Sequence, residues 1–595
     1  MIAPGPRERR KWIAVGALLS FLALLLWHLD SGLDIPGYPD KAIEEKTSKE
    51  EVTHHSEHTD KTSEQPASKV EVSKPGAPAP DLPHIPQHLF DQVLNLAAVD
   101  TKEVHLISDL HNLKTNAEFI PYIAGISNVR NLSVADAYGT CDYKEEELSS
   151  FKYHADADWV REPLSSAVID PLREAWQYFV KNRLIPWDAV KQKYEGRGIV
   201  IVGGGSSHDV NRIKAILRAL NKHGSKLPVE INYFGDELKE PTRQQLTAIY
   251  GSDKLFFNDL SDSSQTWVTF KSLMNNYQLK TAGLINARFA EMLLLDADNI
   301  PTSDPAALFD SKAYKEYGSV FWPDYTRTRK KHPAWAAFNT LCRRDEYEFE
   351  TGQVLVDKRR YFYHLQLAAW MNTQDYWRKM LLGDKDLFRY AWHALKTGFG
   401  RPVMWLTSLG FVAEQADGKD GSKMVYCGHT FGQAHPDHSA SASDKSSGIS
   451  FLHGGALKTM GAPLLARLRK LNGGIFTHFK RVKVETLEDW SKLEYAAGTE
   501  HWSAGYYYNL TSKHAPSDLV NVDKDFDLDG QKIGEEKVKA LELTEKDAKK
   551  VILCMNFGHV EARPIAELGM DAEGFEGLFE GVGGYWAIED NYRGW

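Results

Sequence analysis

The chain has 595 residues, enough for two or more domains or for one large core with additions. Its formal net charge of -10 argues against a nucleic-acid-binding protein, which normally presents a basic face. The four cysteines show no Cys-x-x-Cys spacing, which argues against a zinc site. They either form up to two disulfides, as an oxidising compartment would allow, or remain free buried thiols.

The first 29 residues have the pattern of a membrane anchor. Residues 1–11 are rich in Arg and Lys, and residues 12–29 carry no formally charged side chain, so a helix over them would span about 27 Å. Because the positive cluster comes first, we expect a cytosolic tail, an uncleaved transmembrane signal anchor and a lumenal remainder. A cleaved signal peptide is the alternative, but no small-x-small site follows closely. Sequons at Asn131 and Asn509 are compatible with a lumenal location.

Two segments precede the expected core. Residues 30–87 are rich in charged and hydroxyl side chains and end in a Pro-rich run, which is typical of a disordered stem. Residues 88–195 are mainly helical in pattern and form a lead-in without assigned chemistry. In one of its helices Asp170 is expected to be the N-cap and Pro171 the first helical residue.

A β-α-β unit is expected to open the core. Residues 197–205 and 228–234 have the pattern of buried strands, and residues 210–220 between them form an amphipathic helix. Such a unit implies parallel strands. Gly203 to Gly205 either let a nucleotide approach the backbone or form a tight turn. There is no Gly-x-Gly-x-x-Gly pattern or P-loop lysine to decide between these two possibilities.

The most informative stretch is the apolar run 292–295, which follows Glu291 and leads into Asp296 and Asp298. It follows a predicted helix over residues 279–289 and has the pattern of a buried strand that stops abruptly. Side chains two apart on an extended backbone point the same way, so both carboxylates can face one point beyond the strand. Such carboxylates repel each other unless a cation lies between them, and Mn²⁺ or Mg²⁺ fits oxygen ligands. The alternative is that both aspartates cap a turn.

Further elements follow in the expected core. Residues 319–324 form a short strand, and the pattern of residues 347–357 suggests a strand broken by a turn. Residues 383–392 start an N-capped helix, and residues 449–452 form another strand.

His453 is the best candidate for a third metal ligand. It follows the last predicted strand and precedes Gly454 and Gly455, which would let backbone come close to phosphates. Lys458 could then neutralise phosphate charge. A purely structural histidine is the alternative.

An ion that bridges a diphosphate makes it a good leaving group, which suits transfer of a sugar from a nucleotide-diphosphate donor. Transfer also needs groups that orient the sugar and the acceptor hydroxyl. The catalytic candidates are Glu350, Asp384 and Asp386, with a surface or cap role as the alternative for each.

Taken in order, six segments between about residues 190 and 460 resemble the fungal Golgi type II α-mannosyltransferases, the family that extends cell-wall mannan in yeast. The segments are Gly196–Gly203, Leu227–Asp236, Leu294–Pro301, Phe321–Asp324, Glu350–Lys358 and Gly383–Arg389. One departure is Thr351, since the family's common pattern has Glu-Ser-Gly at this point.

The resemblance implies an α/β fold of the GT-A nucleotide-sugar-binding type with a mixed central sheet. It also implies GDP-mannose as donor, Mn²⁺ or Mg²⁺ as cofactor, a glycan acceptor and retention of configuration, for which no catalytic base is needed. Asp296 would lie on the ribose or metal side of the donor and Asp298 would bind the metal. The expected location is the Golgi membrane, as a single-pass type II protein with a lumenal catalytic domain and a Golgi transferase complex as a further partner.

The expected catalytic domain spans residues 196–464, and residues 465–595 form a C-terminal extension of unknown role. Within the extension, residues 525–536 have EF-hand spacing, with an acidic turn as the alternative to calcium binding. Two other functions stay open: a transferase that uses another nucleotide sugar such as a UDP-sugar, and a non-catalytic Golgi glycan-binding or scaffold protein. The donor-binding candidates are Gly203, Asp236, Lys280, Asp296 and Lys458.

Overall fold

In the computed structural model of the chain, the described residues all lie between Val72 and Trp595. The described residues are 92–94, 96, 110–126, 129–138, 141, 164–271, 276–324, 328, 331–343, 346–374, 376–377, 384–403, 408–417, 421–438, 448–454, 476–482, 497–503, 551–557, 560–569, 572–579 and 582. The predicted anchor, the stem and the candidate calcium loop lie outside them. In this described part, no helix has both the length and the apolar character needed to cross a bilayer.

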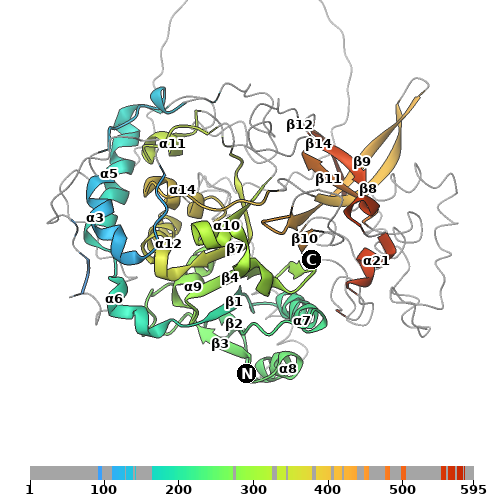
Figure 1. The fold of residues 1–595 in the computed structure, drawn as a ribbon, viewed down its shortest axis with the longest axis horizontal. Coiled ribbons are helices and arrows are strands. Elements are labelled where there is room, and N and C mark those ends of the chain that lie inside the picture. The colour runs from blue at the N-terminus through green and yellow to red at the C-terminus, as the bar shows by residue number, and fades with distance from the viewer. Residues whose placement is uncertain are drawn as a thin grey trace, which may run out of the picture. The chain divides into compact units, whose positions relative to one another are not determined.

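Six strands of the described residues form one sheet, in the order β3-β2-β1-β4-β7-β6 (Figure 1). Their bounds are β1 (Arg197–Val202), β2 (Val229–Tyr233), β3 (Leu255–Asp259), β4 (Glu291–Asp296), β6 (Ser319–Pro323) and β7 (Phe349–Asp357). Strands β1 to β4 are parallel, whereas β7 is antiparallel to both β4 and β6. The prediction of an α/β core with a mixed central sheet is therefore confirmed.

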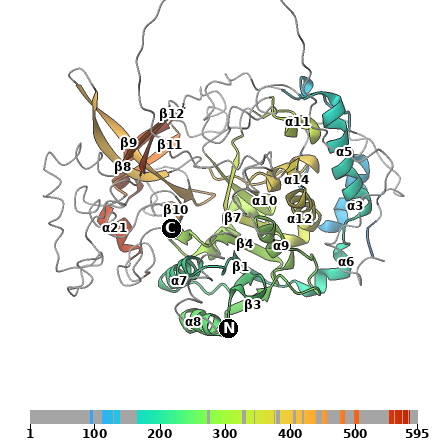
Figure 2. The same cartoon turned by 180° about the vertical axis from the view of Figure 1, so that it is seen from behind.

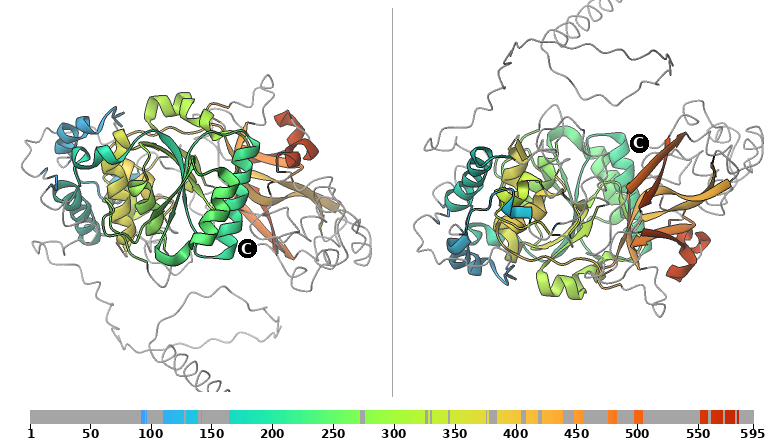
Figure 3. Two further views of the ribbon diagram at one scale, coloured as in Figure 1. Left: turned by 90° about the horizontal axis from the view of Figure 1, so that it is seen from below. Right: turned by 90° about the horizontal axis from the view of Figure 1, so that it is seen from above.

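Helices cover both faces of this sheet, as Figures 1 and 2 show and the turned views of Figure 3 repeat. The α-helices are α3 (Asn116–Ile126), α5 (Ser166–Asn182), α6 (Trp187–Val190), α7 (Ser207–Lys222), α8 (Glu240–Tyr250), α9 (Gln278–Asn286), α10 (Lys312–Tyr317), α11 (Pro333–Ala337), α12 (Lys358–Thr373), α14 (Leu387–Ala394) and α21 (Ala572–Gly577). The 3₁₀ helices are η2 (Asp136–Tyr138), η5 (Lys191–Lys193), η6 (Gly235–Glu237), η7 (Pro305–Asp310) and η9 (Ile565–Leu568).

The apolar run of β4 is buried on both sides. Met292 and Leu294 pack in the cluster that includes residues of α5, α12 and α14. Leu293 and Leu295, which alternate with them, pack in the cluster that includes residues of α7 and α8. A strand that is covered on both faces has a continuous hydrophobic run rather than an alternating one. Burial on both faces therefore accounts for the unbroken apolar pattern of residues 292–295.

Helix α5 corrects the expectation for Asp170. The helix begins at Ser166 with Ser165 as its N-cap, so Asp170 and Pro171 lie inside it. Asp170 instead accepts a hydrogen bond from Arg173, at 2.5 Å. The earlier start extends the buried face of the helix, since Ile169 lies on the same side as Trp176 and both are buried.

Strand β7 also differs from expectation, because it is one continuous strand of nine buried residues and not a strand broken by a turn. Its pairing with β6 passes from Val354 directly to Glu350, so residues 351–353 have no partner on that side. A bulge of this kind bends a strand and redirects side chains, and bulges are over-represented next to active sites. Gly352, which lies within the expected turn, therefore belongs to a bulge.

Eight strands of the described segments form a second, antiparallel sheet. They are β5 (Asn299–Pro301), β8 (Ser408–Asp417), β9 (Gly421–Ala434), β10 (Ile449–His453), β11 (His478–Val482), β12 (Ala497–Ser503), β13 (Val551–Phe557) and β14 (Val560–Pro564). The last four come from the C-terminal extension. Strand β5 directly follows the predicted metal ligands and pairs with β10, which pairs with β9. The indole N–H of Trp322 on β6 also donates to the carbonyl of Ala434 on β9, at 2.8 Å.

A disulfide joins Cys141 to Cys342, across 201 residues of sequence. Cys427 is also disulfide-bonded. The choice that the sequence left open, between disulfides and free thiols, is thus decided for these three residues. The Cys141–Cys342 bond ties the helical lead-in to the loop that precedes β7.

Candidate functional site

The predicted aspartates lie at the C-terminal end of β4. Asp296 is the last residue of the strand and pairs in register with Val202 at the end of parallel β1. Asp298 follows in the turn and is buried, and Asn299 starts β5. In open α/β sheets, ligands bind beyond the carboxyl ends of parallel strands. The local sequence thus places both carboxylates at the edge where a ligand is expected.

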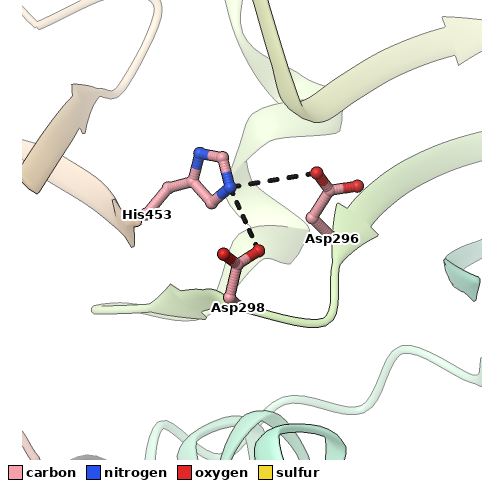
Figure 4. A group of neighbouring side chains, drawn as sticks. All are labelled: Asp296, Asp298 and His453. Carbon is pink, nitrogen blue, oxygen red and sulfur yellow. Dashed lines mark hydrogen bonds and ion pairs between the residues drawn. The ribbon is translucent and has the colours of Figure 1, made fainter. Parts of the chain in front are cut away.

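His453 reaches these carboxylates from the second sheet. Antiparallel pairing of β10 with β5 puts His453 opposite Asn299. Its Nε2 atom lies 3.2 Å from Oδ1 of Asp298 and 3.8 Å from Oδ2 of Asp296. Figure 4 shows the ring directed at both carboxylates. The structure therefore brings together three residues that were predicted as metal ligands across 155 positions of sequence.

The three side chains fit a divalent cation. In the described part of the chain, one ligand atom from each of Asp296, Asp298 and His453 lies within 4.8 Å of the others. Ligands at about 2.1 Å in octahedral geometry lie about 3 Å apart when adjacent and about 4 Å apart when opposite. The distances of 3.2 and 3.8 Å fall in this range. Two carboxylates and one imidazole suit Mn²⁺ and tolerate Mg²⁺.

Lys280 on α9 links Asp296 to Asp384. Its Nζ atom lies 2.8 Å from Oδ1 of Asp296 and 3.0 Å from Oδ2 of Asp384. It also donates to the backbone carbonyl of Thr351, at 3.3 Å. This partly buried ammonium offsets part of the negative charge that would otherwise accumulate at the sheet edge.

Glu350 on β7 lies on the other side of the histidine ring. Its Oε1 atom is 3.0 Å from Nδ1 of His453 and accepts a hydrogen bond from the backbone N–H of Gly352, at 2.8 Å. A Cβ atom on Gly352 would stand 2.5 Å from Nδ1 of the same ring. Glycine at this position therefore makes room for the imidazole.

A cavity of about 220 Å³ lies beside the cluster, at the ends of β1 and β2. Its lining includes Gly203, Gly204, Gly205, Asn232, Tyr277 and Lys280. The glycine run thus lies between a strand end and a helix start and lines the cavity, while its approach to a nucleotide stays a prediction. Helix α7 starts just after the run, with its N-cap Ser206 accepting from the backbone N–H of Asp209.

The charged groups of the cluster shift one another's pKa values. Burial alone would lower the pKa of His453, but the carboxylates of Glu350 and Asp298 outweigh it and hold the pKa well above its ordinary value. Burial raises the pKa of Asp296, while Lys280 and His453 act in the opposite direction. Burial acts to lower the pKa of Lys280, yet Asp296 and Asp384 raise it overall. The carboxylates therefore favour the charged forms of Lys280 and His453, and the imidazole would release a proton on binding a cation.

Other predicted residues are placed elsewhere. Asp236 lies in η6 and does not line the cavity, whereas its neighbour Glu237 does. Asp386 is buried, accepts from the backbone N–H of Phe349 at 3.0 Å and forms an ion pair with Arg389 at 2.9 Å. Its carboxylate therefore neither caps α14 nor joins the cluster. Lys458 lies outside the described residues.

Several residues of the site were not predicted. The side chain of Asn299 donates to the carbonyl of Gly352, at 2.7 Å, and to Oε1 of Gln353, at 2.6 Å. Tyr277 lines the cavity and is 40% exposed. A buried polar pair such as Asn299 and Gln353 leaves little trace in a sequence. Only the pairing of β7 with β4 brings Gln353 close to Asn299, which follows β4 in the chain.

Fold and site together define an α/β domain with a candidate metal site beyond the carboxyl end of β4. Residues 196–347 match the family model described as "Mannosyltransferase putative". Over this segment, the resemblance to the mannosyltransferase family is confirmed.

Similar curated proteins carry related names. Alpha-1,2-mannosyltransferase MNN2 of Candida albicans is 33% identical over 292 residues, which cover 41% of this chain and 48% of the relative. Alpha-1,2-mannosyltransferase MNN24 of the same organism is 28% identical over 281 residues, which cover 39% of this chain and 38% of the relative. Alpha-1,2-mannosyltransferase MNN2 of Saccharomyces cerevisiae is 33% identical over 146 residues, 24% of each chain. The chain thus spans less than half the length of each of these three relatives.

Solved structures of glycosyltransferases are more distant. The galactosyltransferase LgtC in complex with donor and acceptor sugar analogs has a TM-score of 0.25 at 13% identity, and the match covers 33% of this chain and 70% of that one. The apo structure of the bifunctional glycosyltransferase WbbM has a TM-score of 0.27 at 11% identity, and the match covers 34% of this chain and 38% of that one.

Proposed function

We propose that this protein is a metal-dependent, retaining α-mannosyltransferase that moves mannose from GDP-mannose to a mannose-containing glycan, in protein glycosylation or cell-wall mannan synthesis. The observation that carries the proposal is the cluster of Asp296, Asp298 and His453 beside a glycine-lined cavity at the sheet edge. The names of the relatives that match over the same region support the choice of mannose as the transferred sugar.

The residues of the site have separate roles in this proposal. Asp296, Asp298 and His453 would hold a divalent cation, Mn²⁺ or Mg²⁺, which supplies positive charge to the leaving diphosphate when bound. The backbone at Gly203 to Gly205 lets a nucleotide approach closely, since glycine has no side chain. Lys280 lines the cavity and contacts Asp296, so it lies where it can attract donor phosphate.

Of the three predicted catalytic acids, Asp384 is best placed to orient the sugar. It lies 3.0 Å from Lys280, which lines the cavity. Glu350 faces His453, and Asp386 faces Arg389. In a retaining reaction the leaving phosphate can assist attack from its own side, so no residue is assigned as a base.

The sequence of the N-terminal region supports a location in the Golgi membrane, with a single-pass type II topology and the catalytic domain in the lumen. A glycan acceptor and association with a Golgi transferase complex belong to the same proposal. Membrane fractionation and protease protection of the full chain test the topology. Protection of an epitope at the C-terminus in intact vesicles is expected, and its digestion would reject the topology.

The direct test is transfer of mannose from GDP-mannose to a mannose acceptor by the full chain in the presence of Mn²⁺. Asp298→Ala removes a buried ligand and is expected to reduce the rate at least about 100-fold. Asp310→Ala is a suitable control, because Asp310 is an exposed aspartate that pairs with Lys315 at 3.7 Å. Undiminished transfer by Asp298→Ala would reject the metal role.

Donor identity is tested separately by thermal unfolding with Mn²⁺ and either GDP or UDP. Ligands that bind only the native state raise the unfolding temperature. Stabilisation by GDP supports the proposal, and stabilisation by UDP alone points to another nucleotide sugar. If neither stabilises the chain, a non-catalytic glycan-binding or scaffold role is favoured instead.

A further inference from the structure

The imidazole of His453 lies between two carboxylates that approach its opposite nitrogens. Nε2 is 3.2 Å from Asp298, and Nδ1 is 3.0 Å from Glu350. Because the two ring nitrogens point in different directions, a carboxylate at Nδ1 cannot share an ion bound at Nε2. Consistent with this geometry, Glu350 does not belong to the group of three ligands in the described residues.

The carboxylate of Glu350 is itself held in place. Its Oε1 atom accepts from the backbone N–H of Gly352, at 2.8 Å, and Oε2 accepts from Nε2 of Gln353, at 3.3 Å. The side-chain oxygen of Gln353 accepts from Asn299, at 2.6 Å. Since Asn299 follows Asp298 directly, this chain of hydrogen bonds joins the strand behind the histidine to the turn that carries the metal ligands.

The ring of His453 has little room to turn. A Cβ atom on Gly352 would stand 2.5 Å from Nδ1, which shows how closely the backbone of the bulge approaches. The ring of Phe431 on β9 stacks against the imidazole, with centroids 6.1 Å apart and planes inclined by 22°. The ring is therefore restricted by packing, and the carboxylate of Glu350 lies at ion-pair distance from Nδ1, which makes no aligned hydrogen bond in this structure.

We propose that Glu350 is a positioning residue that accepts the Nδ1–H of His453 and so directs the lone pair of Nε2 at the cation. This inference rests on the proposed metal site and replaces the catalytic role expected for Glu350 from sequence. A neutral imidazole carries one N–H, and the hydrogen bond at one nitrogen determines which nitrogen is free to bind metal. Carboxylate partners of metal-binding histidines fix the tautomer and the ring orientation in this way.

The test is the affinity of the full chain for Mn²⁺, measured by calorimetry without donor. Loss of such a partner typically weakens metal binding about 10- to 100-fold, and Glu350→Ala is expected to fall in this range. Glu350→Gln keeps an acceptor at Nδ1 and is expected to lose less Mn²⁺ affinity than Glu350→Ala. The matched control is Glu348→Gln, since Glu348 is a buried neighbour that pairs with Lys385 and not with the histidine.

A double-mutant cycle separates positioning from direct ligation. If Glu350 acts only through the imidazole, Glu350→Ala should weaken Mn²⁺ binding no further once His453→Ala is present. Thermal unfolding checks that each variant is folded. If Glu350→Ala does not fold, the cycle is run with the nearly isosteric Glu350→Gln, for which the same lack of additivity is expected.

The outcomes distinguish the two proposals. Additive losses in the cycle, or an unchanged affinity in Glu350→Ala, would overturn the positioning role while the metal site stands. Absence of Mn²⁺ binding by the unmodified chain would overturn the metal site itself, and the positioning role with it. Weaker binding in Glu350→Ala, partial retention in Glu350→Gln and no additivity would together support the inference.

Discussion

The two sheets contribute to the site in different ways. The mixed sheet supplies Asp296 and Asp298 from one strand end and the turn that follows it, so their proximity follows from local sequence. The antiparallel sheet supplies His453 from a strand 155 positions further on, through its pairing with β5. The carboxylates are thus a property of one strand, whereas the imidazole is in place only when both sheets are formed.

The C-terminal extension, whose role was unknown from sequence, contributes to the antiparallel sheet. Strands β11 to β14 of the extension complete the sheet in which β9 and β10 lie. Arg218 and Lys222 on α7 also donate to the carbonyls of Val582, at 3.3 Å, and Gly577, at 2.9 Å. The extension therefore packs against the helix that follows the glycine-lined loop, and it supports the sheet that holds His453.

The contribution of the antiparallel sheet to the metal site is tested most strongly by removing His453. His453→Ala is expected to weaken Mn²⁺ binding on the order of 100-fold, because one of three protein ligands is lost. Calorimetry measures the change. His478→Ala, in β11 of the same sheet, is the control and should keep full affinity. Equal affinity in His453→Ala would show that the two aspartates suffice.

A smaller effect is expected when the contact between the two sheets is disturbed without removal of a ligand. In Gly352→Ala the new Cβ meets the histidine ring at 2.5 Å, so the ring or the bulge must move. We expect Mn²⁺ affinity to fall about tenfold and unfolding to become easier by about 1–3 kcal/mol. Gly577→Ala has open space around the new Cβ and should change neither the Mn²⁺ affinity nor the free energy of unfolding.

Lys280→Met tests the charge balance of the first sheet through pH. Burial raises the pKa of Asp296 and Lys280 acts against it, so loss of the ammonium should raise this pKa further. Only the ionised carboxylate binds metal, and protons compete more strongly when the pKa is higher. The pH at which Mn²⁺ binding falls on acidification should therefore move up by about one unit. An unchanged pH profile would contradict the assigned contact, and Lys315→Met serves as the surface control.

The smallest effect on the site is expected from the disulfide. Replacing Cys141 and Cys342 with serine removes a bond that closes a long loop, and typically costs about 2–4 kcal/mol of unfolding free energy. Because neither residue contacts the cluster, Mn²⁺ affinity at temperatures below unfolding should not change. Denaturant unfolding and calorimetry on the same preparation separate the two effects, and a large loss of affinity would show that the lead-in supports the site.

Much of the first sheet could be predicted from sequence. The buried strands β1, β2 and β4 were expected within a residue or two, apart from the glycine run after β1, since a short continuous apolar run that ends in polar residues is typical of a buried strand. The bulge of β7 was mistaken for a turn, because a glycine in a strand pattern indicates either one. The start of α5 was misplaced because Asp170 resembles a helix cap, whereas the buried face of the helix extends beyond it.

The sequence by itself determined that Asp296 and Asp298 lie where a buried strand ends, because an apolar run that stops at polar residues is a local feature. The expected alternation along an extended backbone does not apply to Asp298, because β4 ends at Asp296 and Asp298 lies in the turn that follows. The sequence also nominated His453, from its apolar strand and the glycines beside it. Only the tertiary structure decided that this histidine meets the carboxylates, since the pairing of β5 with β10 joins distant segments. It likewise decided that Glu350 faces Nδ1 of the imidazole, because that orientation depends on the bulge at residues 351–353.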